Sequence, residues 1–137
     1  MKITSADRFF SLCIRKRAGF RCERCFTAYG GPTQALHCAH FMGRGAWSTR
    51  FDPGNATSLD MGCHLYFTSR PAEFADWYAA RVGLDEVERI KRVSKQPVPG
   101  IKKHIREIGQ FYKREYDEMR LGGQFRAWIP GLVFEVA

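Results

Sequence analysis

A pair of cysteines two residues apart, Cys22-Glu-Arg-Cys25, is the feature that most constrains how this chain can fold. Thiolates at this spacing can grip one zinc ion from a single turn, and such a half-site needs a second half further along the chain. The same spacing recurs at Asp60-Met-Gly-Cys63, with a carboxylate in the first place. Because zinc also accepts carboxylate oxygen, we predict a structural zinc site formed by Cys22, Cys25, Asp60 and Cys63.

The fourth ligand has alternatives, because Cys38 or His37 could replace Asp60. The chain has five cysteines, and this odd number with CxxC spacing favours metal or redox chemistry over a disulfide framework. A thiol redox protein would need a βαβ context, which the sequence does not indicate. The remaining interpretation is that Cys22 and Cys25 are free thiols beside a surface loop. Cys13 lies on the apolar side of a predicted helix and is expected in the core.

Length and composition predict one globular domain, because 45% of the 137 residues are hydrophobic. No apolar run approaches the ~18 residues of a membrane span, and the N-terminus lacks a secretory signal pattern. We therefore expect a cytoplasmic protein. The net charge of +8 favours a polyanionic partner, with nucleic acid first and an anionic membrane surface second.

The pattern of hydrophobic and turn-forming residues predicts an α+β fold. A first helix is expected over about 6–18, with Ser5 as its cap and Gly19 at its end. The apolar stretch 35–41 is flanked by turns and predicts a strand, with a short returning strand near 47–51. A short helix or turn would then carry Asp60, Cys63 and His64.

The second half of the chain is predicted to be largely helical. One helix should start after a Ser69 cap and stop at Gly83, with Trp77 and Tyr78 on its buried stripe. A shorter helix over 85–94 should follow, then a linker. A long helix over about 101–120 would place six apolar residues on one face, and the apolar segment 127–136 could form a last strand. The six are Ile101, Ile105, Ile108, Tyr112, Tyr116 and Met119.

The spacing of histidines and thiols, "CERC … HCAHF … GN … DMGCH", resembles an HNH endonuclease of the ββα-metal, or His-Me finger, superfamily. Residues 37–64 and the following "FADWYAARVGLDEVERI" more narrowly resemble NinG/Rap-like phage recombination endonucleases. The resemblance covers about residues 20–95. It implies a small ββα-metal core with a zinc knuckle over about 20–70, flanked by helical extensions at 5–18 and 71–120.

The resemblance also implies roles for three residues. His40 matches the general base that takes a proton from the attacking water, and an unperturbed pKa near ~6.5 would suit that role. Asn55 matches the asparagine that fixes the base and its loop. His64 matches the ligand of a catalytic Mg²⁺ or Mn²⁺ ion, which polarises the scissile phosphate and stabilises the leaving 3′ oxygen. The implied products are a 5′ phosphate and a 3′ hydroxyl.

The expected partner is DNA, and the resemblance alone implies branched DNA such as Holliday junctions or D-loops. Arg44 and Arg50 are candidate phosphate clamps, because a guanidinium matches phosphate oxygens bidentately. Trp47 lies between them in sequence and could stack on an unpaired base. A junction nuclease would benefit from a homodimer, whose interface the C-terminal segment could supply.

The chain departs from the family pattern at two positions. Many HNH proteins carry an acidic metal ligand directly before the base, where this chain has Ala39. His37 lies three positions before His40, so strand alternation would place it on the other face and disfavour it as a replacement. The second departure is Asp60, which stands where cysteine is usual. Two other functions therefore remain as alternatives: a zinc-stabilised DNA-binding module without catalysis, and a sequence-specific or nicking HNH endonuclease.

Overall fold

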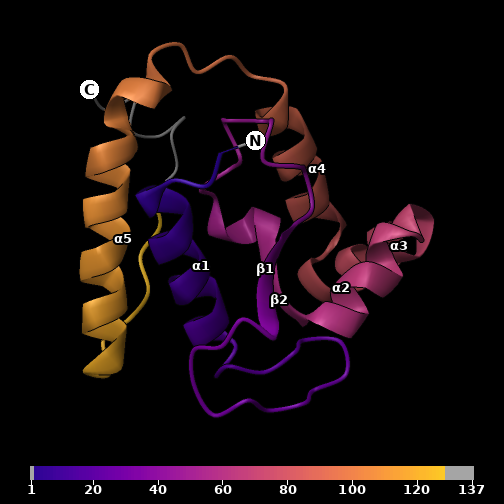
Figure 1. Ribbon diagram of the computed structural model, residues 1–137. Coiled ribbons are helices and arrows are strands. Elements are labelled where there is room, and N and C mark those ends of the chain that lie inside the picture. The colour runs from indigo at the N-terminus through magenta and orange to yellow at the C-terminus, as the bar shows by residue number, and fades with distance from the viewer. Residues whose placement is uncertain (1, 129–137) are drawn as a thin grey trace.

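The computed structural model describes residues 2–128, and within them the fold is α+β (Figure 1). Five helices flank one two-stranded antiparallel hairpin in this part of the chain, which confirms the predicted α+β class. The elements are α1 (Ser5–Arg17), β1 (Leu36–His40), β2 (Ala56–Asp60), α2 (Met61–Thr68), α3 (Pro71–Val82), α4 (Leu84–Ser94) and α5 (Ile105–Arg120). Most of the strand predicted at 127–136 lies outside the described residues.

Local capping fixes the ends of α1. Thr4, not Ser5, is the N-cap: its hydroxyl accepts the Asp7 N–H, and the Asp7 carboxylate accepts the Thr4 N–H at 2.8 Å. This reciprocal arrangement is a capping box, which satisfies backbone donors that a helix start leaves unpaired. Gly19, at φ +66°, turns the chain away after the helix, as predicted.

The hairpin pairs Leu36 with Asp60 and His40 with Ala56. The strand predicted near 47–51 is therefore wrong, because β2 lies further along the chain. Residues 47–51 form successive turns instead, with backbone hydrogen bonds such as Thr49 N–H to Ala46 and Asp52 N–H to Thr49. These local bonds already satisfy the backbone, and a 3₁₀ turn at Pro53–Asn55 leads into β2.

Helix α2 follows β2 without a connecting loop, and Asp60 is its N-cap. It contacts both strands, so β1, β2 and α2 form a ββα unit. Ser69 ends α2 rather than starting α3, which begins at Pro71 after Arg70 and stops at Gly83. The predicted buried stripe of α3 is confirmed, since Tyr78 is buried and Trp77 packs against the core.

Helix α5 packs along α1 on the side of the hairpin opposite α2 and α3 (Figure 1). The predicted helix over 101–120 starts as a 3₁₀ turn, Ile101–His104, and its apolar face joins the main core. Cys13 is fully buried there, as expected, and its thiol donates to the Tyr112 carbonyl at 3.3 Å.

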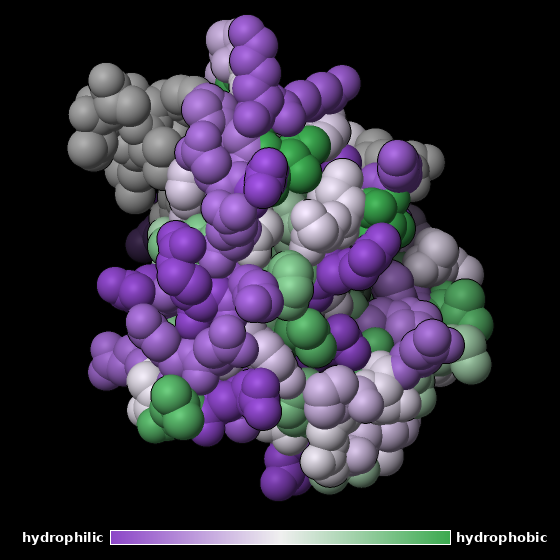
Figure 2. All heavy atoms as spheres, turned by 60° about the vertical axis from the view of Figure 1, so that its left-hand side comes forward, coloured by the Kyte–Doolittle hydropathy of each residue, from purple (hydrophilic) through white to green (hydrophobic). Residues whose placement is uncertain are grey.

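Hydrophilic side chains crowd the face of the molecule seen from the side of α5 (Figure 2). Hydrophobic and neutral residues show between them in smaller areas. None of the helices in residues 2–128 has the length and apolar character needed to cross a membrane.

Candidate functional site

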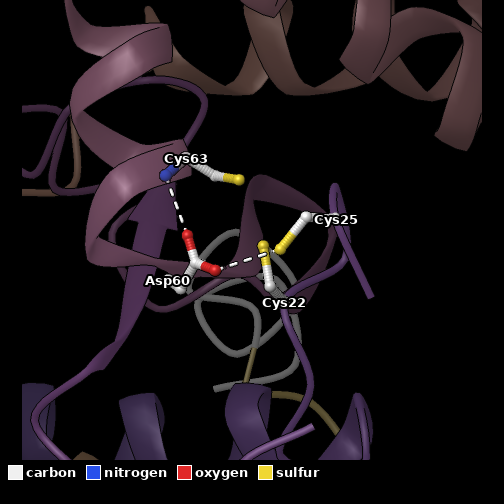
Figure 3. Close-up of side chains that lie close together, drawn as sticks. All are labelled: Cys22, Cys25, Asp60 and Cys63. Carbon is white, nitrogen blue, oxygen red and sulfur yellow. Dashed lines mark hydrogen bonds between the residues drawn. The ribbon is translucent and has the colours of Figure 1, made fainter. Parts of the chain in front are cut away.

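Cys22, Cys25, Asp60 and Cys63 come together at one end of the hairpin, as the sequence predicted (Figure 3). Their sulfur and carboxylate oxygen atoms all lie within 4.8 Å of one another. Ligands at ~2.3 Å around a tetrahedral zinc ion would be about 3.8 Å apart, so a small contraction would complete the coordination. The group could therefore hold a zinc ion.

The turn that carries the first two thiols is clasped to β2. The Cys22 N–H bonds to the Thr27 carbonyl, and Phe26 adopts a left-handed backbone at φ +64° to close the turn. Ser58 on β2 then holds the turn through its hydroxyl, which donates to the Arg21 carbonyl at 2.8 Å, and its N–H, which donates to the Glu23 carboxylate at 2.9 Å. These contacts place the turn beside Asp60, two residues further along.

Electrostatics at this cluster favour a cation. Burial and the neighbouring Asp60, Cys22 and Cys25 raise the pKa of the Cys63 thiol to about 12. Burial acts to raise the pKa of Asp60 too, but hydrogen bonds from the Cys25 thiol and the Cys63 N–H lower it to about 2. A divalent cation would offset this crowding of anions and deprotonate the thiols, which is how structural zinc sites bind.

Neither sequence alternative for the fourth ligand joins this cluster. His37 and Cys38 are on β1, where both line a separate hollow of about 390 Å³. The two carboxylate oxygens of Asp60 have different contacts. One accepts the Cys63 N–H and so caps α2, and the other accepts a hydrogen bond from the Cys25 thiol at 3.0 Å. The sequence prediction of Asp60 as the fourth member is the one that the geometry supports.

This hollow beside β1 brings together residues from three parts of the chain. His40 comes from the end of β1, Arg44 from the loop after it, and His64 from the first turns of α2. The two histidines that the HNH resemblance singles out therefore line the same small space, beside one guanidinium. Arg44 lowers the pKa of both imidazoles through its charge, in addition to the larger effect of burial.

The ring of His40 is held in one orientation. Its Nε2 lies 2.9 Å from the main-chain carbonyl of Arg50. Because a carbonyl oxygen only accepts, Nε2 must carry the proton in the neutral ring, and Nδ1 keeps a lone pair. Burial lowers the pKa of His40 to about 4, well below the unperturbed value that the sequence suggested. His40 is therefore a neutral imidazole with a proton-accepting Nδ1 at neutral pH.

Asn55 is fully buried and holds the loop that follows His40. Its Oδ1 accepts the Met42 N–H at 2.7 Å, and its Nδ2 donates to the carbonyls of Met42 and Thr49 at 2.9 and 3.1 Å. Its own carbonyl accepts the Phe41 N–H. The amide thus ties both ends of the 42–49 loop.

His37 lies against His64, with 2.9 Å between their Nδ1 atoms. The expectation that strand alternation keeps His37 away from His40 is wrong, because both side chains line the hollow. The strand still alternates, since His40 lies against Phe10 of α1 and His37 lies against His64 of α2, but the hollow is lined by side chains from both faces of β1. Ala39, in contrast, is buried against Leu59 and Cys63, so an acidic residue there would point into the core.

No protein-family model, curated protein or solved structure matches this chain. The geometry of the two sites therefore carries any functional assignment.

Arg50 has a different place from the one expected. Its side chain is fully buried and forms a bidentate pair with Asp7, at 2.9 and 2.7 Å. Its Nη1 also donates to the Arg44 carbonyl, and its guanidinium lies 4.2 Å from the ring of Trp47. Arg50 is thus a structural residue rather than a phosphate clamp, and the half-buried Trp47 packs under it instead of standing free.

Sequence reasoning missed two participants. The sequence places Asp7 in a helix and gives it no role in the site, although it anchors Arg50 and so the carbonyl that orients His40. No local signal marks this pair, because its members are 43 positions apart. His37 has a signal in its sequence proximity to His40, although strand alternation alone favours opposite faces for the two side chains.

Proposed function

We propose that this chain is a metal-dependent DNA endonuclease of the HNH type, built on the ββα unit of β1, β2 and α2. The observation that carries the proposal is the shared hollow, where His40, Arg44 and His64 meet. The cluster of Cys22, Cys25, Asp60 and Cys63 would then serve as a structural zinc site that braces this unit. The proposal includes a preference for branched DNA, and this part of it rests on the NinG/Rap resemblance.

His37 and His64 are the residues that would hold the catalytic ion. Their Nδ1 atoms are 2.9 Å apart, and neighbouring ligands at ~2.1 Å around an octahedral ion are about 3.0 Å apart. Burial, His37 and Arg44 lower the pKa of His64, which favours the neutral ring that a metal ligand requires. His37 takes the place of the acid that the family carries before the base. When bound, a divalent cation would polarise the phosphate and stabilise the leaving oxygen.

The remaining steps belong to the side chains of this chain. Arg44 neutralises the charge of the scissile phosphate from the edge of the hollow. His40 accepts a proton from water at Nδ1, while its Nε2–H stays on the Arg50 carbonyl. The water oxygen bonds to phosphorus as the bond to the 3′ oxygen breaks. The products are a 5′ phosphate and, after the leaving oxygen takes up a proton from solvent, a 3′ hydroxyl.

The experiment is cleavage of a labelled four-way junction and of a linear duplex of the same sequence. Reactions contain Mg²⁺ or Mn²⁺, with EDTA added in parallel, and compare the wild type with His40→Ala. Preferential cleavage of the junction by the wild type only would support the full proposal. Equal cleavage of both DNAs would keep the nuclease and remove the branched preference.

A zinc-stabilised DNA-binding module is the second candidate. The direct His37–His64 contact favours it, because the two rings satisfy each other by a hydrogen bond without any ion. Binding of both DNAs with no cleavage in Mg²⁺ or Mn²⁺ would establish that function in place of the nuclease.

A further inference from the structure

A groove of about 760 Å³ runs between α1 and the segment leading into β1. Helix α1 contributes Arg8, Ser11, Leu12 and Arg15, which follow an i, i+3, i+4, i+7 spacing and so share one face. The opposite wall comes from residues 32–34 and β1. This surface is outside the set of residues that the sequence singled out for DNA contact, apart from Arg44 at its end.

The groove combines an apolar floor with a cationic rim. Leu12 and Leu36 are the less exposed apolar residues of its lining, while the charged lining residues are Arg8, Arg15 and Arg44 together with Asp7. Asp7 is the one carboxylate among the described lining residues, and it is already paired with Arg50. The free charge facing the groove is therefore positive, which suits a polyanion.

The cations differ in how firmly they are held. Arg15 is preorganised, because its Nε donates to the Ser11 hydroxyl at 3.0 Å and its Nη1 to the Thr33 carbonyl at 3.1 Å. Arg8 is exposed, and its guanidinium has no hydrogen bond or ion pair within residues 2–128. A flexible cation and a fixed one, two helical turns apart, can follow successive phosphates of an extended strand.

The groove is continuous with the hollow described above, because both are lined by His37, Cys38, His40 and Arg44. An occupant of the groove would therefore end beside the imidazole of His40. Pockets of ~300–1,000 Å³ enclose molecules of nucleotide size, so a duplex is too wide for this space. A single strand with one base over the apolar floor fits both its size and its charge.

We propose that the groove between α1 and β1 binds an unpaired strand of DNA, with its phosphates on Arg8 and Arg15 and a base over Leu12, and guides it to Arg44 and His40. This inference deepens the proposed function and names its substrate element: the single-stranded arm or unstacked nucleotide at a branch. Its test is binding without any added divalent cation, so it does not depend on cleavage.

Fluorescence anisotropy of a labelled single-stranded oligonucleotide would compare the wild type, Arg8→Gln and Arg92→Gln over a range of salt concentrations. Arg92 is an exposed arginine of α4, so its variant removes the same charge outside the groove. We expect Arg8→Gln to weaken binding about 3- to 10-fold and to reduce the salt slope by about 0.7, the value for one lost contact with a single strand. Equal effects of the two variants would overturn the proposal.

The base contact has its own measurement. The wild type should bind an oligonucleotide with bases more tightly than an abasic strand of equal length and charge, and Leu12→Gln should reduce that difference. Equal affinity for both strands, or equal competition by polyglutamate, would overturn the assignment to DNA. The nuclease proposal and the groove proposal can fail independently. If the protein binds single strands through the groove but never cleaves DNA, only the nuclease proposal fails. If it cleaves DNA and Arg8→Gln and Leu12→Gln leave cleavage unchanged, only the groove proposal fails.

Discussion

The imidazole of His40 is tied to the backbone of Arg50, since Nε2 donates to that carbonyl at 2.9 Å. The same residue that orients the candidate base is fixed at its other end by Asp7. The environment of His40 thus depends on the first turn of α1 as well as on the hairpin.

The first prediction concerns the protonation of His40. Its Nε2–H tautomer should be the neutral form, and its pKa should be near 4 because burial disfavours the charged ring. A titration of the ¹⁵N and ¹³C shifts of the ring by NMR would measure both properties. A midpoint near pH 6.5, or a proton on Nδ1, would contradict the geometry described here.

The lowered pKa also predicts how stability depends on pH. The unfolded chain binds a proton on His40 near pH 6.5, whereas the folded protein binds it only near pH 4. Its contribution is therefore complete above pH 6.5 and is lost as the pH falls toward 4. Between pH 7.5 and 5 we expect the stability difference between the wild type and His40→Gln to shrink by about 2 kcal/mol. Urea unfolding of both proteins at the two pH values would measure this change. An equal difference in the free energy of unfolding at pH 7.5 and pH 5 would contradict it.

The second pair to test is Arg50 with Asp7. Asp7→Asn leaves a buried guanidinium without its counter-charge, so we expect a loss of about 3–5 kcal/mol in the free energy of unfolding. Asp117→Asn, which removes the exposed partner of Arg120 at 3.9 Å, is the matched control and should change it by less than about 1 kcal/mol. Similar losses in the two variants would mean that the buried pair has no special role.

Asn55→Ala should also destabilise the protein. It removes three side-chain hydrogen bonds and leaves the N–H and carbonyl of half-buried Met42 without this partner, while the Thr49 carbonyl keeps the Asp52 N–H. We expect a loss of about 2–4 kcal/mol, since each unsatisfied buried group costs about 1–3 kcal/mol. Hydrogen exchange of the Met42 amide would locate the effect, and unchanged protection there would refute the proposed loop contact.

Metal content provides a prediction for the cysteine cluster. The purified protein should contain one zinc ion per chain, and its removal by a strong chelator should lower the melting temperature. Cys22→Ser and Cys63→Ser should lose the ion, whereas Cys38→Ser should keep it because Cys38 lies outside the cluster. Mass spectrometry of the native protein and elemental analysis would measure the stoichiometry. Full zinc in Cys63→Ser would exclude the four-residue site.

Short-range patterns predicted much of this structure. The helices at 71–82, 84–94 and 105–120 follow from hydrophobic spacing and from glycine or proline at their ends, which are local properties. The ligand group was also predictable, because two CxxC-type spacings are each a local turn. The return strand was placed too early, since the turns at 47–51 contain a few apolar residues that resemble a strand.

The buried state of Arg50 could not be predicted in the same way. An arginine in a polar segment is most often exposed. The burial of Arg50 is favourable because Asp7 of α1 forms an ion pair with it. The contact of His37 with His64 likewise depends on how α2 packs against β1. Both are tertiary relationships, so no single stretch of sequence contains them.

The packing of α5 on α1 has a consequence for synthesis on the ribosome. Cys13 and Tyr112 are 99 positions apart, and Tyr112 also bonds through its hydroxyl to the Phe51 carbonyl, next to Arg50. The nascent chain cannot bury the apolar face of α1, or support the segment that orients His40, until residues 105–120 have been made. Translation of α5 is thus the step that completes the candidate site, and a chain released earlier would leave the apolar face of α1 exposed.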